Sequence, residues 1–117
     1  MYKIGEFAKL TNLSVKTLRY YNEIGLLIPE EVDVYNNYRY YGERNLKETL
    51  IINKLKKAGF SLDEIINNWG NFTDDVYLKK KNQLFKEMED VESKIKLIDD
   101  LRYELNKNNV KVKSIGE

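Results

Sequence analysis

The chain has 117 residues and a formal net charge of +1; 33% of its residues are charged and 12% are aromatic. This balance is typical of one folded, soluble domain with an extension. Cysteine and histidine are absent, which excludes disulfides, thiolate or imidazole metal sites and histidine-based catalysis. No apolar run approaches the roughly 20 residues of a membrane span, and no signal peptide is recognisable. We therefore expect a cytoplasmic protein that is not an enzyme and needs no cofactor.

Positive charge is concentrated in the first half of the chain. Residues 1–60 contain ten Lys and Arg against seven Asp and Glu, whereas residues 61–117 contain ten against twelve. A basic front half favours contact with nucleic acid. The excess is small, so the assignment depends on the structural pattern.

The first 25 residues are typical of two short helices joined by a turn. Apolar residues at helical spacing predict a helix over residues 4–10, and residues 11–13 predict the turn. Ser14 is a suitable N-cap for a second helix over residues 15–24, with Gly25 following where a left-handed residue ends helices. This is the helix-turn-helix arrangement. From spacing alone, an ordinary helical hairpin fits equally well.

The second helix has a polar, basic outer face that matches the needs of a helix in a DNA major groove. Four residues are expected to project outward, namely Lys16, Thr17, Arg19 and Tyr20. Their side chains include donors for phosphates and for base edges. The positions expected to face the core are Val15, Leu18, Tyr21 or Asn22, and Leu26.

A β-hairpin is predicted after Pro29, the only proline. Residues 32–35 and 38–41 are rich in β-branched and aromatic side chains and flank Asn36-Asn37, a suitable turn. Tyr38 and Arg39 could then lie along a phosphate strand. Alternatively Tyr38 and Tyr40 pack on one strand face and Arg39 is solvated; for Tyr40 we prefer the packing role.

Two further helices follow in the front half. Leu46, Leu50, Ile51 or Ile52, and Leu55 predict an amphipathic helix over residues 44–57. Its last turn holds three lysines, which also suit the helix dipole, so a DNA role for Lys56 needs other support. Ser61 and Glu64 form a capping box for a fourth helix that ends at Gly70.

The rear segment predicts one long helix, beginning after Thr73. Apolar residues recur in steps of four and three over about four heptads, which is a coiled-coil stripe. A second copy of the chain is the simplest partner for this stripe, because no other segment is long enough to cover it. Alternatively, the helix folds back on its own domain. The proposed dimer contacts are Leu84, Met88, Val91, Ile95, Ile98 and Leu105.

These observations divide the chain into three parts. Residues 1–70 are expected to form a winged-helix DNA-binding domain, and residues 71–109 a dimerisation helix. Residues 110–117 alternate apolar and polar side chains like a strand without a partner. We interpret this tail as the first strand of a further, effector-binding domain that the 117 residues do not contain.

Several motifs resemble the MerR family of bacterial transcription regulators. They are Ile4-Gly-Glu-Phe-Ala-Lys-Leu10, Ser14-Val-Lys-Thr-Leu-Arg-Tyr-Tyr21, Gly25-Leu-Leu, Pro29, Tyr38-Arg-Tyr-Tyr41 and Gly59-Phe-Ser-Leu-Asp-Glu-Ile65. The spacing from Pro29 to Tyr38 and the pair Val32-Asp33 look most like the BmrR-like multidrug-sensing branch. The metal-sensing and redox-sensing branches need cysteines, which this chain lacks. The family usually has glycine where Asn37 stands, so the wing turn is expected to differ in detail.

The resemblance implies a mainly α fold, a winged helix-turn-helix domain with a small β-hairpin wing, followed by a long helix in an antiparallel intersubunit coiled coil. It also implies a homodimer that binds a palindromic operator in a promoter spacer, distorts the DNA and so acts indirectly on RNA polymerase. A small-molecule effector would require the C-terminal domain of a longer form. The implied DNA-binding residues are Lys16, Thr17, Arg19, Tyr20, Tyr21, Tyr38, Arg39 and Lys56.

Two other functions remain open from the sequence. One is an architectural or excisionase-like winged-helix protein, which the long heptad helix disfavours because such proteins are usually short. The other is a coiled-coil module that docks another protein through its hairpin. Salt-dependent binding to duplex DNA would separate this module from the two DNA-binding functions.

Overall fold

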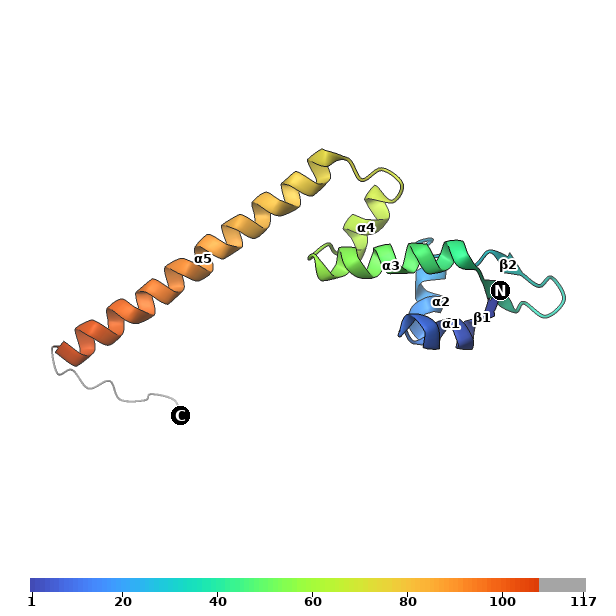
Figure 1. Ribbon diagram of the computed structural model, residues 1–117, viewed down its shortest axis with the longest axis horizontal. Helices are drawn as coiled ribbons and strands as arrows, with labels where there is room; N and C mark the ends of the chain where they lie inside the picture. The colour runs from blue at the N-terminus through green and yellow to red at the C-terminus, as the bar shows by residue number, and fades with distance from the viewer. Residues whose placement is uncertain (108–117) are drawn as a thin grey trace. The chain divides into compact units, whose positions relative to one another are not determined.

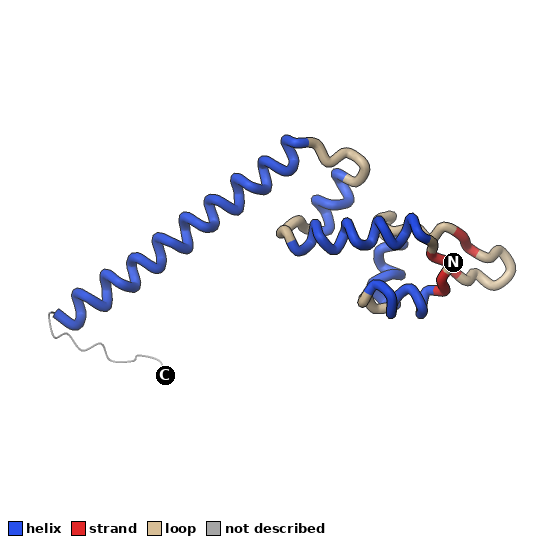
Figure 2. The backbone as a smooth tube through the Cα atoms, viewed as in Figure 1, coloured by secondary structure: helices blue, strands red, loops and turns tan. Residues whose placement is uncertain are grey.

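A computed structural model describes residues 1–107 of the chain (Figures 1 and 2). It is mainly helical, with a small antiparallel sheet and a long last helix, as the sequence predicts. The elements in order are β1 (Tyr2–Lys3), α1 (Ile4–Thr11), α2 (Val15–Glu23), β2 (Glu31–Val32), β3 (Arg39–Tyr41), α3 (Glu43–Lys57), α4 (Leu62–Asn68) and α5 (Asp74–Lys107). They form two compact units, Met1–Phe72 and a second that begins at Thr73.

The helix-turn-helix is formed by α1 and α2, and local chemistry sets its boundaries. Asn12 ends α1 in the left-handed conformation, with φ 58° and ψ 31°. The Ser14 hydroxyl accepts a hydrogen bond from the backbone N–H of Thr17 at 2.9 Å and caps α2. Gly25, with φ 77°, follows the end of α2. The predicted cap and stop residues of α2 are thus confirmed.

A small aromatic and aliphatic core holds α1, α2, α3, α4 and the sheet together. Phe7 of α1 stacks on Tyr41 of β3, with ring centroids 4.6 Å apart. Its largest fully buried apolar and aromatic side chains are Phe7, Leu18, Tyr21, Leu27, Tyr41, Ile52 and Ile65. Because α2 contributes both Leu18 and Tyr21 to this core, its opposite face is fixed toward solvent.

The sheet has three strands in the order β1-β3-β2, all antiparallel. Tyr2 pairs with Tyr41, and Glu31 pairs with Tyr40. The strand β1 was not predicted, because two residues are too few to show an alternating pattern. It places the N-terminus of α1 beside the wing strand β3.

The hairpin is shorter than predicted: its first strand, β2, ends at Val32 instead of continuing to residue 35, whereas β3 covers three of the four residues predicted over 38–41. Asp33 lies outside the strands, and its carboxylate accepts from the backbone N–H groups of Tyr35 at 2.8 Å and Asn36 at 3.3 Å. This local turn competes with strand pairing. Asn37 alone takes a left-handed conformation in the loop, with φ 58°.

The buried face of α3 also differs from the prediction. Leu50 and Ile51 are 53% and 52% exposed, so they do not form the core face. The buried residues of α3 are Asn45, Thr49, Ile52 and Leu55. A polar residue faces the core here because the wing base needs hydrogen-bond partners, as described below.

The last two helices begin where the sequence predicts, and α4 does so with its predicted cap. Ser61 and Glu64 form the capping box of α4, and Asp74 and Asp75 occupy the first turn of α5. The apolar stripe of α5 is largely exposed in the single chain, from 42% at Leu84 to 58% at Ile98. No helix in residues 1–107 is long and apolar enough to cross a membrane. The predicted tail strand lies outside the described residues.

Candidate nucleic-acid interface

Three of the four residues of α2 that were predicted to point outward have solvent-exposed side chains. Lys16 and Arg19 are exposed, and the Tyr20 side chain is half exposed. Thr17 is half-buried, and its hydroxyl accepts a hydrogen bond from the Ser14 hydroxyl at 2.8 Å. Thr17 therefore belongs partly to the cap of the helix that presents the other three.

The wing adds a second cationic and aromatic element. Arg39 lies at the start of β3, and Tyr38 immediately precedes that strand. The Tyr38 ring is exposed, and the Lys3 ammonium lies 5.9 Å from its centroid, within the range of a cation–π contact. The wing strand and the N-terminal strand thus present charge on one surface.

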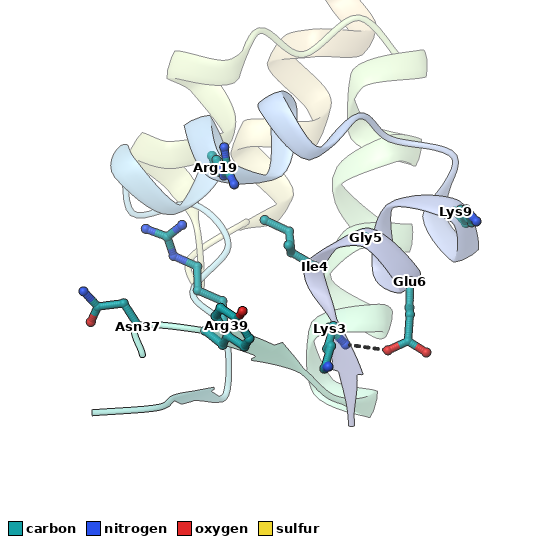
Figure 3. Close-up of a pocket in the computed structure, with 9 residues that line it drawn as sticks. Lys3, Ile4, Gly5, Glu6, Lys9, Arg19, Asn37 and Arg39 are labelled. Atoms are coloured by element: carbon teal, nitrogen blue, oxygen red, sulfur yellow. Dashed lines mark hydrogen bonds between the residues drawn. The ribbon is translucent and has the colours of Figure 1, made fainter. Parts of the chain in front are cut away.

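A cleft of about 590 Å³ is lined by residues of α2 and of the wing (Figure 3). Its lining residues come from β1, α1, α2, β3 and the loop before β3. They are Lys3, Ile4, Gly5, Glu6, Lys9, Arg19, Asn37, Tyr38 and Arg39. Four of these side chains are cations and one is a carboxylate, a balance of 4 − 1 = +3. We call this group the basic cleft.

The charges of the basic cleft are poorly neutralised by the protein. Glu6 accepts a hydrogen bond from the backbone N–H of Lys3 at 3.1 Å, so its carboxylate serves the start of α1 (Figure 3). Among residues 1–107, no carboxylate forms an ion pair with Arg19 or Arg39. Figure 3 shows the Arg39 side chain extending from β3 toward that of Arg19. Two guanidinium groups on one open surface favour an anionic ligand.

The same two arginines affect the pKa of a buried tyrosine, Tyr41. Burial raises the pKa of the Tyr41 hydroxyl, while the positive charges of Arg39 and Arg19 lower it by a smaller amount. Within the described residues this hydroxyl has no hydrogen-bond partner. The Tyr41 side chain is therefore neutral at pH 7, and it packs in the core against Phe7.

A second basic surface lies at the end of α3. Its hollow of about 600 Å³ is lined by Thr11, Asn12, Leu13, Leu50, Asn53, Lys54, Lys56 and Lys57. The Lys56 ammonium donates to the Tyr21 hydroxyl at 3.2 Å. The Tyr21 side chain is only 1% exposed, so its ring packs in the core. The hydroxyl is therefore the part of Tyr21 that contacts this lysine-lined surface.

Asn45 fixes the base of the wing. Its side-chain oxygen accepts from the backbone N–H of Glu30 at 3.1 Å and of Gly42 at 3.2 Å. Its side-chain nitrogen donates to the carbonyl of Ile28 at 2.7 Å. One buried amide thus holds the segment entering the wing and the segment leaving it, which positions Arg39.

The structure groups five of the eight predicted residues in two places, while Lys16, Thr17 and Tyr20 line neither of them. Arg19, Tyr38 and Arg39 share the basic cleft, whereas Tyr21 and Lys56 meet at the end of α3. The predicted site lacked four polar lining residues of the cleft, namely Lys3, Glu6, Lys9 and Asn37. The only signal for the two lysines was the positive charge of the front half. Lys3 lies on β1, which was not predicted, and Lys9 lies on the predicted helix α1, whose pattern does not show that it lies near the wing.

Comparison with known proteins agrees with this geometry. Residues 2–68 match the family described as MerR HTH family regulatory protein. The multidrug-efflux transporter 1 regulator of Bacillus subtilis strain 168 is 45% identical over 64 residues, which are 55% of this chain and 23% of that protein. The regulator CueR of Vibrio cholerae is 41% identical over 61 residues, or 52% of this chain and 43% of CueR. The chain thus spans less than half the length of these relatives.

Solved structures show similar folds over more of the chain. The N-terminal part of MtaN, the Bacillus subtilis multidrug transporter activator, has a TM-score of 0.75 and 30% identity, covering 86% of this chain and 97% of that one. EcmrR in its DNA complex has a TM-score of 0.78 and 27% identity, covering 93% and 41%. Together with the match over residues 2–68, more than half of the sequence, these likenesses confirm the expected resemblance: the chain belongs to the MerR family of helix-turn-helix regulatory proteins.

Proposed function

We propose that this chain is a dimeric, sequence-specific regulator that binds a palindromic promoter operator and distorts the DNA between its half-sites. The observation that carries the proposal is the basic cleft. Its four cations include Arg19 of the recognition helix and Arg39 of the wing, neither of which is paired with a carboxylate in the described chain. A duplex supplies a dense row of phosphates that such cations can neutralise.

The proposed DNA contacts divide into two kinds. Lys16, Arg19 and Tyr20 project from α2, which is short enough to lie in one major groove and read base edges. Tyr38, Arg39 and Lys56 would contact the backbone, which fixes orientation but carries no sequence information.

Thr17 and Tyr21 are assigned supporting roles within this proposal. Thr17 completes the cap of α2, and Tyr21 holds Lys56 through its hydroxyl. Both also belong to the recognition helix, so their substitution would alter how α2 meets the duplex. Lys3 and Lys9 join the proposed surface because they line the same basic cleft.

Dimerisation is proposed to occur through α5. Its exposed stripe includes Leu84, Met88, Val91, Ile95 and Ile98, and Leu105 is half-buried. A contiguous apolar row on a helix of 34 residues favours a partner helix. Two copies of one recognition helix related by a two-fold axis imply a palindromic site.

Relatives support a promoter role. EcmrR is described in complex with DNA within an RNA polymerase open complex. HiNmlR is described as a MerR family regulator that lacks the sensor domain and is bound to promoter DNA; it has a TM-score of 0.54 and 25% identity to this chain, covering 90% of this chain and 87% of its own. We propose that this chain likewise binds promoter DNA, and that any small-molecule effector would act through a C-terminal domain of a longer form.

Selection of bound duplexes from a random pool tests this function. A palindromic consensus, with footprint protection between promoter elements and hypersensitive bases at its centre, is the expected result. Bending of duplexes without any consensus would instead indicate an architectural protein. Absence of salt-dependent duplex binding would overturn the DNA-binding function and favour a protein-docking module.

A further inference from the structure

Charged residues within and beside the apolar stripe of α5 restrict how two copies can pair. Continued in steps of three and four, the stripe includes Lys81 and Tyr77 before Leu84 and Arg102 after Ile98. Lys81 and Arg102 occupy equivalent heptad positions three heptads apart. Glu87 and Lys94 directly precede the stripe residues Met88 and Ile95, so they lie along one flank of the stripe, and both are exposed. Flanking positions of this kind decide partner orientation in coiled coils.

A parallel pair would place like charges against each other. Lys81 would face Lys81 of the second copy within the seam, and Arg102 would face Arg102. At the flank, Glu87 would lie near Glu92 of the second copy. Uncompensated like charges in an apolar seam are strongly unfavourable, because each loses hydration without gaining a counter-charge.

The family resemblance implies an antiparallel pair of α5 helices, and we infer that this pair adopts the single register that places Glu87 of each copy beside Lys94 of the other. This inference rests on the homodimer proposed above. In this register, the stripe residues that face each other have numbers that add up to 179. Leu84 then faces Ile95 of the second copy, and Met88 faces Val91.

The two cations of the stripe find suitable neighbours in this register. Arg102 faces the Tyr77 ring of the second copy, where a guanidinium can stack on an aromatic face. Lys81 faces Ile98, and its long alkyl stem can cover that side chain while the ammonium extends to water. Neither Lys81 nor Arg102 therefore faces the same residue of the second copy.

Shifting the register by one heptad removes the charge complementarity. A shift in one direction places Lys94 beside Lys94 and Glu92 beside Glu92. A shift in the other direction places Glu87 beside Glu87.

The contacts within each α5 helix leave the proposed ion pair possible. Lys94 uses one of its three donors for Asp90 at 2.9 Å and retains two. The Glu87 carboxylate accepts a hydrogen bond from the Gln83 side chain at 3.3 Å, which leaves acceptor positions for a second partner.

Charge reversal tests the register with the full chain. Glu87→Lys and Lys94→Glu are each expected to raise the dimer dissociation constant about 10- to 30-fold, because two attractive pairs become repulsive. An equimolar mixture of the two variants should form a heterodimer of near wild-type affinity, since both of its flanking pairs are again Glu with Lys. Circular dichroism of each variant confirms that α5 remains helical.

Cysteine cross-linking provides an independent measurement, because the chain contains no natural cysteine. Mixed Leu84→Cys and Ile95→Cys chains should form a disulfide-linked heterodimer. The matched control, Leu84→Cys mixed with Arg102→Cys, should not, because these positions face each other only after a one-heptad shift.

The outcomes separate the register from the proposed dimer. A wild-type chain that sediments as a monomer would overturn the dimer and the register together. A dimer in which Glu87→Lys strengthens association, Leu84→Cys links to itself, or the charge-reversed mixture shows no preference for the heterodimer would overturn the register alone.

Discussion

Lys56 donates a hydrogen bond from its Nζ atom to the hydroxyl of Tyr21 across 3.2 Å. This contact joins the last turn of α3 to the recognition helix α2, over 35 residues of sequence. It also holds a cation at the rim of the hollow beside the helix-turn-helix turn. The position of one proposed phosphate contact therefore depends on a tyrosine of the recognition helix.

Tyr21→Phe separates the placement of Lys56 from its charge. We expect a loss of stability of about 1 kcal/mol or less, because the ring still fills the core and only one hydrogen bond is removed. DNA affinity should fall a few-fold with an unchanged salt slope. Lys56→Ala should instead lower the slope of log K against log[salt] by about one. Equal slopes for wild type and Lys56→Ala would remove Lys56 from the interface.

Arg39→Ala tests the basic cleft. We expect weaker binding to all duplexes, specific and nonspecific, and a salt slope reduced by about one, with dimerisation unchanged. Arg44→Ala is the matched control, because Arg44 is an exposed arginine paired with Glu48 at 3.6 Å and lies outside the cleft. Fluorescence anisotropy at several salt concentrations measures both variants. Unchanged affinity in Arg39→Ala would contradict the proposed role.

Asn45→Ala tests the wing base. The substitution leaves the N–H groups of Glu30 and Gly42 and the carbonyl of Ile28 without their side-chain partner. We expect the free energy of unfolding to fall by about 2–3 kcal/mol, since buried polar groups lose hydrogen bonds. Denaturant titration measures this loss. The exposed neighbour Lys47→Ala should stay within about 0.5 kcal/mol of wild type.

Tyr41→Phe removes a buried hydroxyl that has no partner in the described residues. We expect the free energy of unfolding to rise by about 1 kcal/mol at neutral pH, because an unsatisfied polar group no longer has to be buried. A decrease in stability would show that the hydroxyl is hydrogen-bonded in solution.

The same variant has a defined pH dependence. Burial raises the pKa of Tyr41 above its ordinary value of 10.0, so above pH 10 the unfolded chain releases this proton first. Wild-type stability should therefore fall as the pH rises from 10 toward the folded pKa. Tyr41→Phe should show a smaller fall, whereas Tyr35→Phe, which alters a fully exposed side chain, should follow wild type.

Ile95→Asp tests the dimer seam. We expect a monomer by sedimentation, since a carboxylate at the stripe would lose hydration in the interface. Ser93→Asp introduces the same residue away from the stripe and should remain dimeric. A dimeric Ile95→Asp chain would show that α5 pairs through another face or does not mediate dimerisation.

Much of the fold follows from short-range signals in the sequence. Ser14 and Gly25 mark the ends of α2, and Ser61 with Glu64 marks the start of α4, because caps act within a few residues. The spacing of apolar residues likewise predicts α5 and its stripe. The outward residues of α2 follow once Leu18 and Tyr21 are assigned to the core.

Features that depend on distant partners could not be read in this way. The strand β1 is two residues long and exists only because β3 pairs with it. Asn45 lies on the buried face of α3, where its amide forms hydrogen bonds with three backbone groups of the wing base, whereas the apolar Leu50 remains exposed. Helical periodicity records which residues share a face but not which polar group another segment requires.

The basic cleft shows the same division. Arg19 and Arg39 are recognisable separately, from the outward face of a helix and from a hairpin motif. Their meeting with Lys3 and Lys9 on one surface requires the pairing of β1 with β3 and the stacking of Phe7 on Tyr41. Local sequence sets helix ends and faces because those interactions span one turn, whereas a charged surface assembled from four elements depends on how the core packs them together.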